Sequence, residues 1–177
     1  MTKTELEACI QAYGTDIYSF CRHLTRCLQE AEDLYQDTFL KAIEKSGSTD
    51  YEKNPKSYLL SIALRIWKNK RRKAAWRKRI ADIQAIDGQM PEAPFDLGGQ
   101  ALEHEVLKKE EALLVRQAVN RLPERLKIPT LLHYMEDLPL AEIAAVMKIP
   151  VGTVKSRLHQ ARKALEKELE VVLDEKH

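Results

Sequence analysis

Hydrophobic residues recur at intervals of three and four along most of the chain, and no segment shows the alternation of a half-buried strand. The first such segment, residues 6–26, carries five apolar residues at helical spacing: Ile10, Tyr13, Ile17, Phe20 and Leu24. A second helix is expected over residues 30–44, with an apolar side made of Leu34, Phe39 and Ile43. Together with the scarcity of glycine and proline, these patterns predict an all-helical protein.

A third helix is expected to begin near Lys56, after Pro55, which the first helical turn tolerates. Its inner stripe consists of Leu59, Ile62, Ala63 and Ile66. The helix then continues into a basic run that ends at Arg79, so one element is apolar at its start and cationic at its end.

The composition changes between residues 80 and 105, where six acids, three glycines and two prolines occur without any Lys or Arg. We interpret residues 84–104 as a flexible acidic linker between two small helical domains, residues 1–83 and 105–177. The acidity of the linker allows two interpretations. It compensates the charge of the basic run, or it occupies a groove that otherwise holds nucleic acid.

The second domain is expected to start with an amphipathic helix near Leu107 and to end in a compact pair of helices, residues 140–147 and about 151–168. The first of the pair has a short buried edge of Ile143, Ala144 and Met147. Pro150 and Gly152 are expected to supply a tight turn. The second helix then has a buried edge of Val154, Leu158, Ala161 and Leu165.

The outward residues early in this second helix are small or cationic: Thr153, Lys155, Ser156, Arg157, His159 and Arg162. Such side chains near a helix N-terminus bring hydrogen-bond donors to phosphates and base edges in a major groove. The pattern therefore predicts a helix-turn-helix that binds duplex DNA. A helical hairpin with a basic outer face that binds nothing is the alternative.

The basic run, residues 65–79, contains nine Lys or Arg and no acid, whereas the whole chain has a formal net charge of +2. Concentrated positive charge repels itself, and a polyanion relieves that repulsion. Trp67 and Trp76, the only tryptophans of the chain, lie within the run. Cations interleaved with flat rings suit single-stranded nucleic acid, which offers phosphates and stacking bases. The alternative is a solvated helix face whose Trp rings pack inward.

Other chemistries lack a candidate site in the sequence. Cys9, Cys21 and Cys27 have no CxxC spacing, so reduced packing residues are favoured over a metal or redox site that includes His23. No phosphate loop, zinc-protease motif or nucleophile elbow is present, which argues against an enzyme and predicts no cofactor. Without a secretory signal or an apolar stretch of about 20 residues, a cytoplasmic protein is expected.

Three segments together, spread over nearly the whole chain, resemble the small, extracytoplasmic-function (ECF) sigma factors of bacterial RNA polymerase. They are AEDLYQDTFLKAIEK (residues 31–45), NPKSYLLSIALRIWKNKRRK (54–73) and LPLAEIAAVMKIPVGTVKSRLHQARKAL (138–165). The resemblance implies three partners: core RNA polymerase, promoter DNA and an anti-sigma factor. It implies no small-molecule substrate.

The resemblance also assigns roles to residues. The first segment would dock on the coiled coil of the polymerase beta-prime subunit through Asp33, Gln36, Asp37 and Phe39. The second would hold the melted −10 promoter element through Arg65, Trp67, Lys68, Asn69, Arg71, Arg72 and Lys73. The third would read the duplex −35 element through the outward residues of the helix-turn-helix given above.

The sequence also departs from the family pattern. Tyr58 stands where the family usually has Trp, and the residues from Leu64 to Lys68 are more basic than usual. Pro129 falls where the family continues a helix, so it is expected to end that helix early or to bend the second domain. Two rival functions remain in view: a helix-turn-helix regulator that binds duplex DNA without polymerase, and a nucleic-acid-processing enzyme or RNA-binding adaptor.

Overall fold

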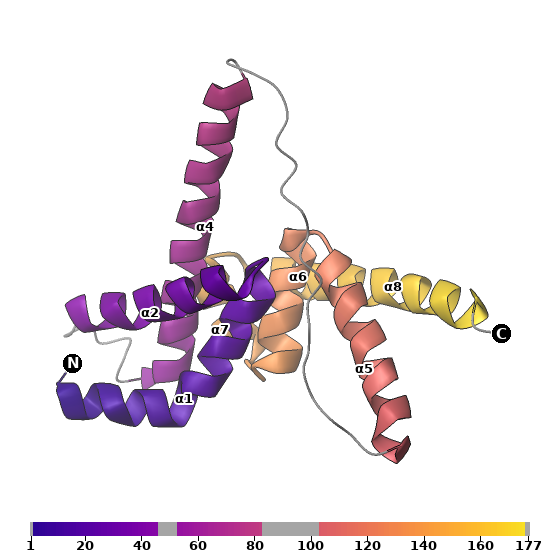
Figure 1. Ribbon diagram of the computed structural model, residues 1–177, viewed down its shortest axis with the longest axis horizontal. Coiled ribbons are helices and arrows are strands. Elements are labelled where there is room, and N and C mark those ends of the chain that lie inside the picture. Colours follow the sequence, from indigo (N-terminus) through magenta and orange to yellow (C-terminus); the bar gives the residue numbers. More distant parts are fainter. Residues whose placement is uncertain (1, 46–52, 83–102, 176–177) are drawn as a thin grey trace. The chain divides into compact units, whose positions relative to one another are not determined.

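The computed structural model describes residues 2–45, 53–82 and 103–175, which are helical throughout apart from short connections and contain no strand (Figure 1). The chain divides into two compact units, Met1–Phe95 and Asp96–His177. The all-helical prediction is confirmed. Most of the predicted linker lies outside the described residues, and its last two residues, Glu103 and His104, already belong to a helix.

The first unit consists of α1 (Lys3–Leu24), α2 (Leu28–Glu44) and α4 (Pro55–Asp82). Helix α1 begins with a capping box, in which the Glu5 amide donates to Thr2 Oγ1 and the Thr2 amide donates to Glu5 Oε2 at 2.7 Å. That hydrogen bond to the Thr2 amide lowers the pKa of the Glu5 carboxyl. Helix α4 begins with Asn54 Oδ1 accepting from the Ser57 amide, with Pro55 in the first turn, as expected.

The core of this unit lies where the three helices meet. Its fully buried side chains include Ile17, Phe20, Leu34, Leu59, Leu60 and Ile62. Burial of such apolar area is the main driving force of folding. Most residues of the predicted stripes are buried, whereas Tyr13, Ile43 and Ile66 are half-buried and Ile10 is 41% exposed. Beyond Trp67 every described side chain of α4 is exposed, and Figure 1 shows this part of α4 extending away from α1 and α2.

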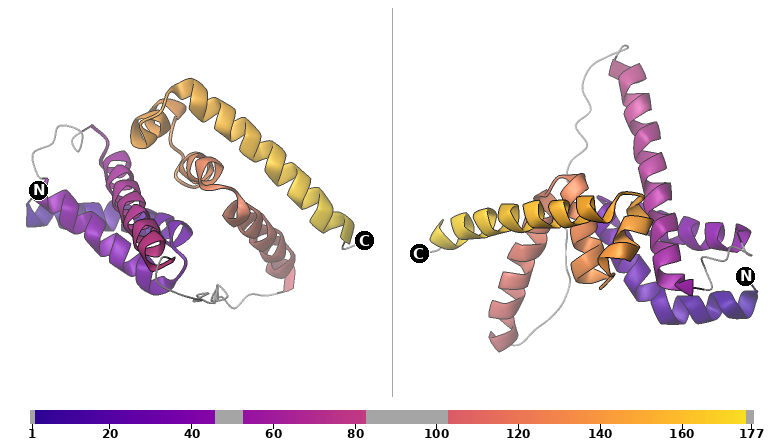
Figure 2. Two further views of the ribbon diagram at one scale, coloured as in Figure 1. Left: turned by 90° about the horizontal axis from the view of Figure 1, so that it is seen from above. Right: turned by 180° about the vertical axis from the view of Figure 1, so that it is seen from behind.

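The second unit consists of α5 (Glu103–Arg121), α6 (Glu124–Thr130), the π-helical η1 (Leu131–Met135), α7 (Leu140–Met147) and α8 (Val151–Glu175). The long helix α8 packs against α5, α6 and α7 (Figure 2). Part of the core is formed by Leu122, Leu126 and Ala161, with Ala164 and Leu165 packed against them. The predicted bounds of α7 are confirmed, whereas α5 begins four residues before Leu107.

Pro129 does not end its helix. It lies buried inside α6, and the helix runs on through Thr130 directly into η1. Because proline has no amide hydrogen, it cannot donate the usual i→i−4 hydrogen bond. The chain absorbs this irregularity in the π-helical turn, where the Glu136 amide donates to the Leu131 carbonyl at 3.2 Å. Of the two effects expected of Pro129, an early helix end or a bend of the second domain, the early end does not occur.

Candidate functional site

The outer face of α2 brings together three of the four predicted docking residues. Asp33 and Gln36 are exposed, and the Asp37 side chain is 45% exposed. Spacings of three and four place these residues on one face of the helix. Phe39 is different, because it is 5% exposed and packs with its ring edge against Tyr35, 5.0 Å between centroids. Phe39 therefore belongs to the core and not to the exposed face of α2.

The predicted −10 surface lies on the cationic half of α4. Arg65, Lys68, Asn69, Arg71, Arg72 and Lys73 are all exposed. Trp67 is 7% exposed, and the Arg71 guanidinium lies over its ring at 5.1 Å from the centroid. Trp76, in contrast, is 65% exposed. The two tryptophans thus divide their roles: Trp67 packs inward, as the alternative interpretation held, and Trp76 presents its ring to solvent.

The two surfaces of the first unit are connected by an ion pair. Lys70 Nζ donates to Asp37 Oδ2 at 2.6 Å, which joins the basic helix α4 to the acidic face of α2. Both side chains are about half exposed, at 50% and 45%, so solvent screens the attraction. Lys70 was not among the predicted site residues, and only the folded structure reveals its partner.

The tight turn between α7 and α8 depends on Lys148. This residue adopts the left-handed conformation, with φ 56° and ψ 47°, and the Ile149 amide donates to the Ala144 carbonyl at 3.1 Å. Pro150 directly precedes α8, which begins at Val151, and its carbonyl accepts from the Thr153 amide at 3.0 Å. Gly152 lies inside the first turn of α8, where an added Cβ would meet nothing within 4 Å. Both Pro150 and Gly152 were expected in this turn. Pro150 lies in it, whereas Gly152 belongs to α8.

Four of the six predicted duplex-binding residues lie on the exposed face of α8. Lys155, Ser156, His159 and Arg162 are exposed, and Thr153 and Arg157 are half-buried. Val154, Leu158 and Ala161 hold the opposite edge in the core, each at most 3% exposed. Arg125 of α6 donates to Gln160 Oε1 at 3.2 Å, which ties this part of α8 to the rest of the unit. The pattern missed that contact because it joins residues 35 positions apart.

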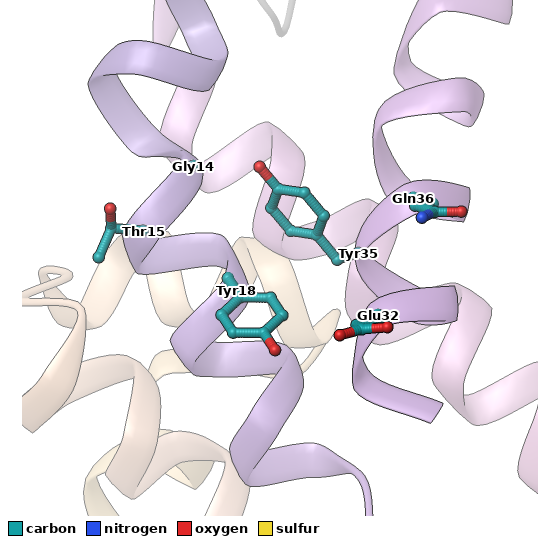
Figure 3. A pocket seen from close by; sticks show the side chains of 6 residues that line it. All are labelled: Gly14, Thr15, Tyr18, Glu32, Tyr35 and Gln36. Atoms are coloured by element: carbon teal, nitrogen blue, oxygen red, sulfur yellow. The ribbon is translucent and has the colours of Figure 1, made fainter. Parts of the chain in front are cut away.

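A hollow that the sequence did not indicate lies between α1 and α2. It is lined by Gly14, Thr15, Tyr18, Glu32, Tyr35 and Gln36. Figure 3 shows the two tyrosine rings between the helices and Glu32 and Gln36 one turn apart on α2. The rings meet edge to face, 5.6 Å between centroids. Burial, and then the nearby Cys21, raise the pKa of the Tyr35 hydroxyl.

The described part of the chain shows no group of three or more His, Cys, Asp or Glu side chains arranged to hold a metal ion. Cys9 and Cys21 are buried free thiols, and Cys27 is an exposed free thiol. None of the helices described here is both long and apolar enough to cross a membrane.

Comparison with known proteins defines the class. Residues 9–77 match the model of sigma-70 region 2, and residues 112–165 match that of sigma-70 region 4. The RNA polymerase sigma-H factor of Pseudomonas aeruginosa is 34% identical over 148 residues, covering 83% of this chain and 77% of that protein. The chain belongs to the sigma-70 family, whose members take part in transcription initiation through binding rather than catalysis.

Within that family the chain is an ECF sigma factor. The ECF sigma factor SigW of Bacillus subtilis is 29% identical over 161 residues, covering 90% of this chain and 86% of SigW. Among solved structures, the sigma factor RpoE of Bartonella quintana, in complex with the anti-sigma factor NepR, matches with a TM-score of 0.69 and 24% identity. The match covers 94% of this chain and 98% of RpoE. CnrH, in complex with the cytosolic domain of CnrY, matches with a TM-score of 0.65 and 17% identity. It covers 96% of this chain and 90% of CnrH.

Proposed function

We propose that this sigma factor docks on core RNA polymerase through the outer face of α2 and directs the enzyme to a small set of promoters. The duplex −35 element binds against α8, and the melted −10 element binds along α4. One observation carries the proposal: an exposed acidic face and an exposed cationic helix share one unit, and a helix-turn-helix with a basic outer face occupies the other.

The role of α2 rests on charge and exposure. Residues 28–40 contain four acids and no Lys or Arg, and Asp33, Gln36 and Asp37 lie on the outer side of the helix. A protein surface with complementary cations is steered toward such a face and held in register. The coiled coil of the polymerase beta-prime subunit is the partner we propose, with Phe39 fixing the helix from below.

The role of α4 rests on its unpacked cationic half. Extruding a base from a duplex costs a few kcal/mol, and stacking on an aromatic ring returns about 1–3 kcal/mol per base. Trp76 is the exposed ring available for stacking, and Arg71, Arg72 and Lys73 lie within two turns of it. Trp67 contributes by packing α4 against the core and by holding Arg71.

Two further features of the proposal concern regulation and location. The solved neighbour RpoE was determined in complex with the anti-sigma factor NepR, and CnrH in complex with the cytosolic domain of CnrY. We propose that an anti-sigma factor likewise holds this protein inactive. Its place of action is the cytoplasm, because core polymerase and promoter DNA are found there.

The test is transcription by purified core polymerase on genomic DNA, with and without the protein, followed by mapping of the RNA start sites. The expected result is a set of new starts that share two upstream elements. A variant with Lys155→Ala and Arg162→Ala serves as the matched control, since it should lose these starts while still binding polymerase. No new starts, together with tight binding to duplex DNA, would favour a regulator that works without polymerase.

A further inference from the structure

The hollow between α1 and α2 has the chemistry of a site for a guanidinium group. Its walls combine two aromatic rings, Tyr18 and Tyr35, with the carboxylate of Glu32 and the side-chain amide of Gln36 (Figure 3). Aromatic faces attract cations, and a carboxylate beside them adds a charged hydrogen-bond acceptor. We infer that this hollow receives an arginine side chain of the docked polymerase coiled coil; this inference rests on the proposed function.

Charge favours a cation over an apolar side chain in this hollow. Glu32 lies in the acidic stretch of α2, which has no Lys or Arg before Lys41. Arg22 is a cation close to the hollow: its guanidinium carbon lies 6.0 Å from the Tyr18 centroid, at the outer limit of a cation–π contact. The Tyr18 ring is therefore already close to one guanidinium group, that of Arg22. A second guanidinium gains the Glu32 carboxylate, which offsets repulsion from Arg22.

Shape favours arginine over lysine. The hollow is shallow and widely open to solvent, with a volume of about 430 Å³. A planar guanidinium can stack on a ring and at the same time donate to both Glu32 and Gln36, which are one turn apart on α2. An ammonium group is a point charge that does not stack in this way. The same α2 face carries Asp33 and Asp37, so the hollow is continuous with the proposed docking surface.

Gly14 of α1 leaves room for the Tyr35 side chain, which lines the hollow. A Cβ at this position would lie 3.0 Å from the Tyr35 hydroxyl oxygen, which is closer than nearly all real Cβ contacts. Glycine inside a helix costs roughly 0.5–1 kcal/mol relative to alanine. Here it allows the Tyr35 hydroxyl to approach α1. Gly14→Ala should therefore improve the intrinsic helicity of α1 while requiring the Tyr35 hydroxyl in the hollow to shift by a few tenths of an ångström.

The experiment measures the affinity of the full-length protein for purified core polymerase by fluorescence competition, with thermal melting as the test of folding. Gly14→Ala, Tyr18→Leu and Glu32→Gln are each expected to weaken binding about five- to thirtyfold, the range of a partly to fully desolvated cation–π or charged contact. Tyr18→Phe keeps the ring and should stay within about twofold of the wild type. Glu7→Gln removes an exposed carboxylate elsewhere on α1 and should change nothing.

Each possible result of these measurements supports or contradicts the inference. If Tyr18→Leu binds as tightly as Tyr18→Phe, the aromatic ring contributes no cation–π contact and the inference is wrong. Unchanged binding of Glu32→Gln would equally exclude a guanidinium beside that carboxylate. A double variant, Asp33→Ala with Asp37→Ala, separates the two levels of the proposal. If it weakens binding while the variants of the hollow do not, only the arginine site fails; if it too binds normally, docking through α2 fails.

Discussion

Replacing Leu158 by alanine should unfold the second unit at a lower temperature without affecting the first. Leu158 is 3% exposed and lies on the inner edge of α8, between Val154 and Ala161. Truncating a buried leucine costs about 2–5 kcal/mol, because transfer free energy is lost and a cavity remains. For a unit of this size, each kcal/mol lowers the melting temperature by about 4–8 °C, so we expect a fall of at least about 8 °C.

The tryptophans make this prediction easy to measure. Both Trp67 and Trp76 belong to the first unit, and Trp67 is 7% exposed, so tryptophan emission follows the unfolding of that unit alone. Far-ultraviolet circular dichroism follows the helices of both units. In Leu158→Ala the dichroism should show an early transition while the midpoint of the tryptophan emission stays at its wild-type value.

Two control variants complete the design. Leu60→Ala, at a fully buried position of α4, should lower the emission midpoint instead. Lys163→Ala, at an exposed position of α8, should leave both signals within the range of an ordinary surface substitution. A Leu158→Ala protein whose two signals fall together would show that the units unfold as one cooperative body, and the reasoning from separate cores would be refuted.

Three further predictions concern binding. Lys155→Ala with Arg162→Ala should weaken binding to duplex DNA; if each contacts one phosphate, the slope of log affinity against log salt should fall by about 1.8, as measured by anisotropy titration. Asp33→Ala with Asp37→Ala should weaken core-polymerase binding and leave duplex affinity unchanged, whereas equal losses by both double variants would contradict the division of labour. Trp76→Ala should leave the melting temperature unchanged, since the ring is 65% exposed, and should cost about 1–3 kcal/mol in single-stranded DNA binding.

Periodicity predicted those parts of the fold that depend on local contacts. The bounds of α7 and the inner edge of α8 follow from spacings of three and four, and Pro150 marks the start of α8. The start of α5 was missed because Glu103 and His104 carry no apolar periodicity. The left-handed turn at Lys148 was missed for another reason: that conformation usually selects glycine or asparagine, so a lysine gives no signal.

For Phe39, the hydrophobic pattern of the helix and the resemblance to the family gave different predictions. The spacing of Leu34, Phe39 and Ile43 placed Phe39 on the apolar side of its helix, whereas the resemblance placed it on the docking surface; the structure buries it. Trp67 follows Ala63 by one turn, so it too continues an apolar stripe. The hollow between α1 and α2 could not be predicted, because Tyr18 and Tyr35 meet only when the two helices pack.

The ion pair between Lys70 and Asp37 connects the two proposed binding surfaces and contributes little to stability. Because both side chains are about half exposed, the pair is worth roughly 0.2–1 kcal/mol, less than a charged hydrogen bond to a partner provides. Asp37 can therefore turn to a cation of the polymerase, and Lys70 to a phosphate, with only a small loss of internal stability. Binding of either partner frees the other residue of the pair, so docking through α2 and DNA binding along α4 should favour one another rather than compete.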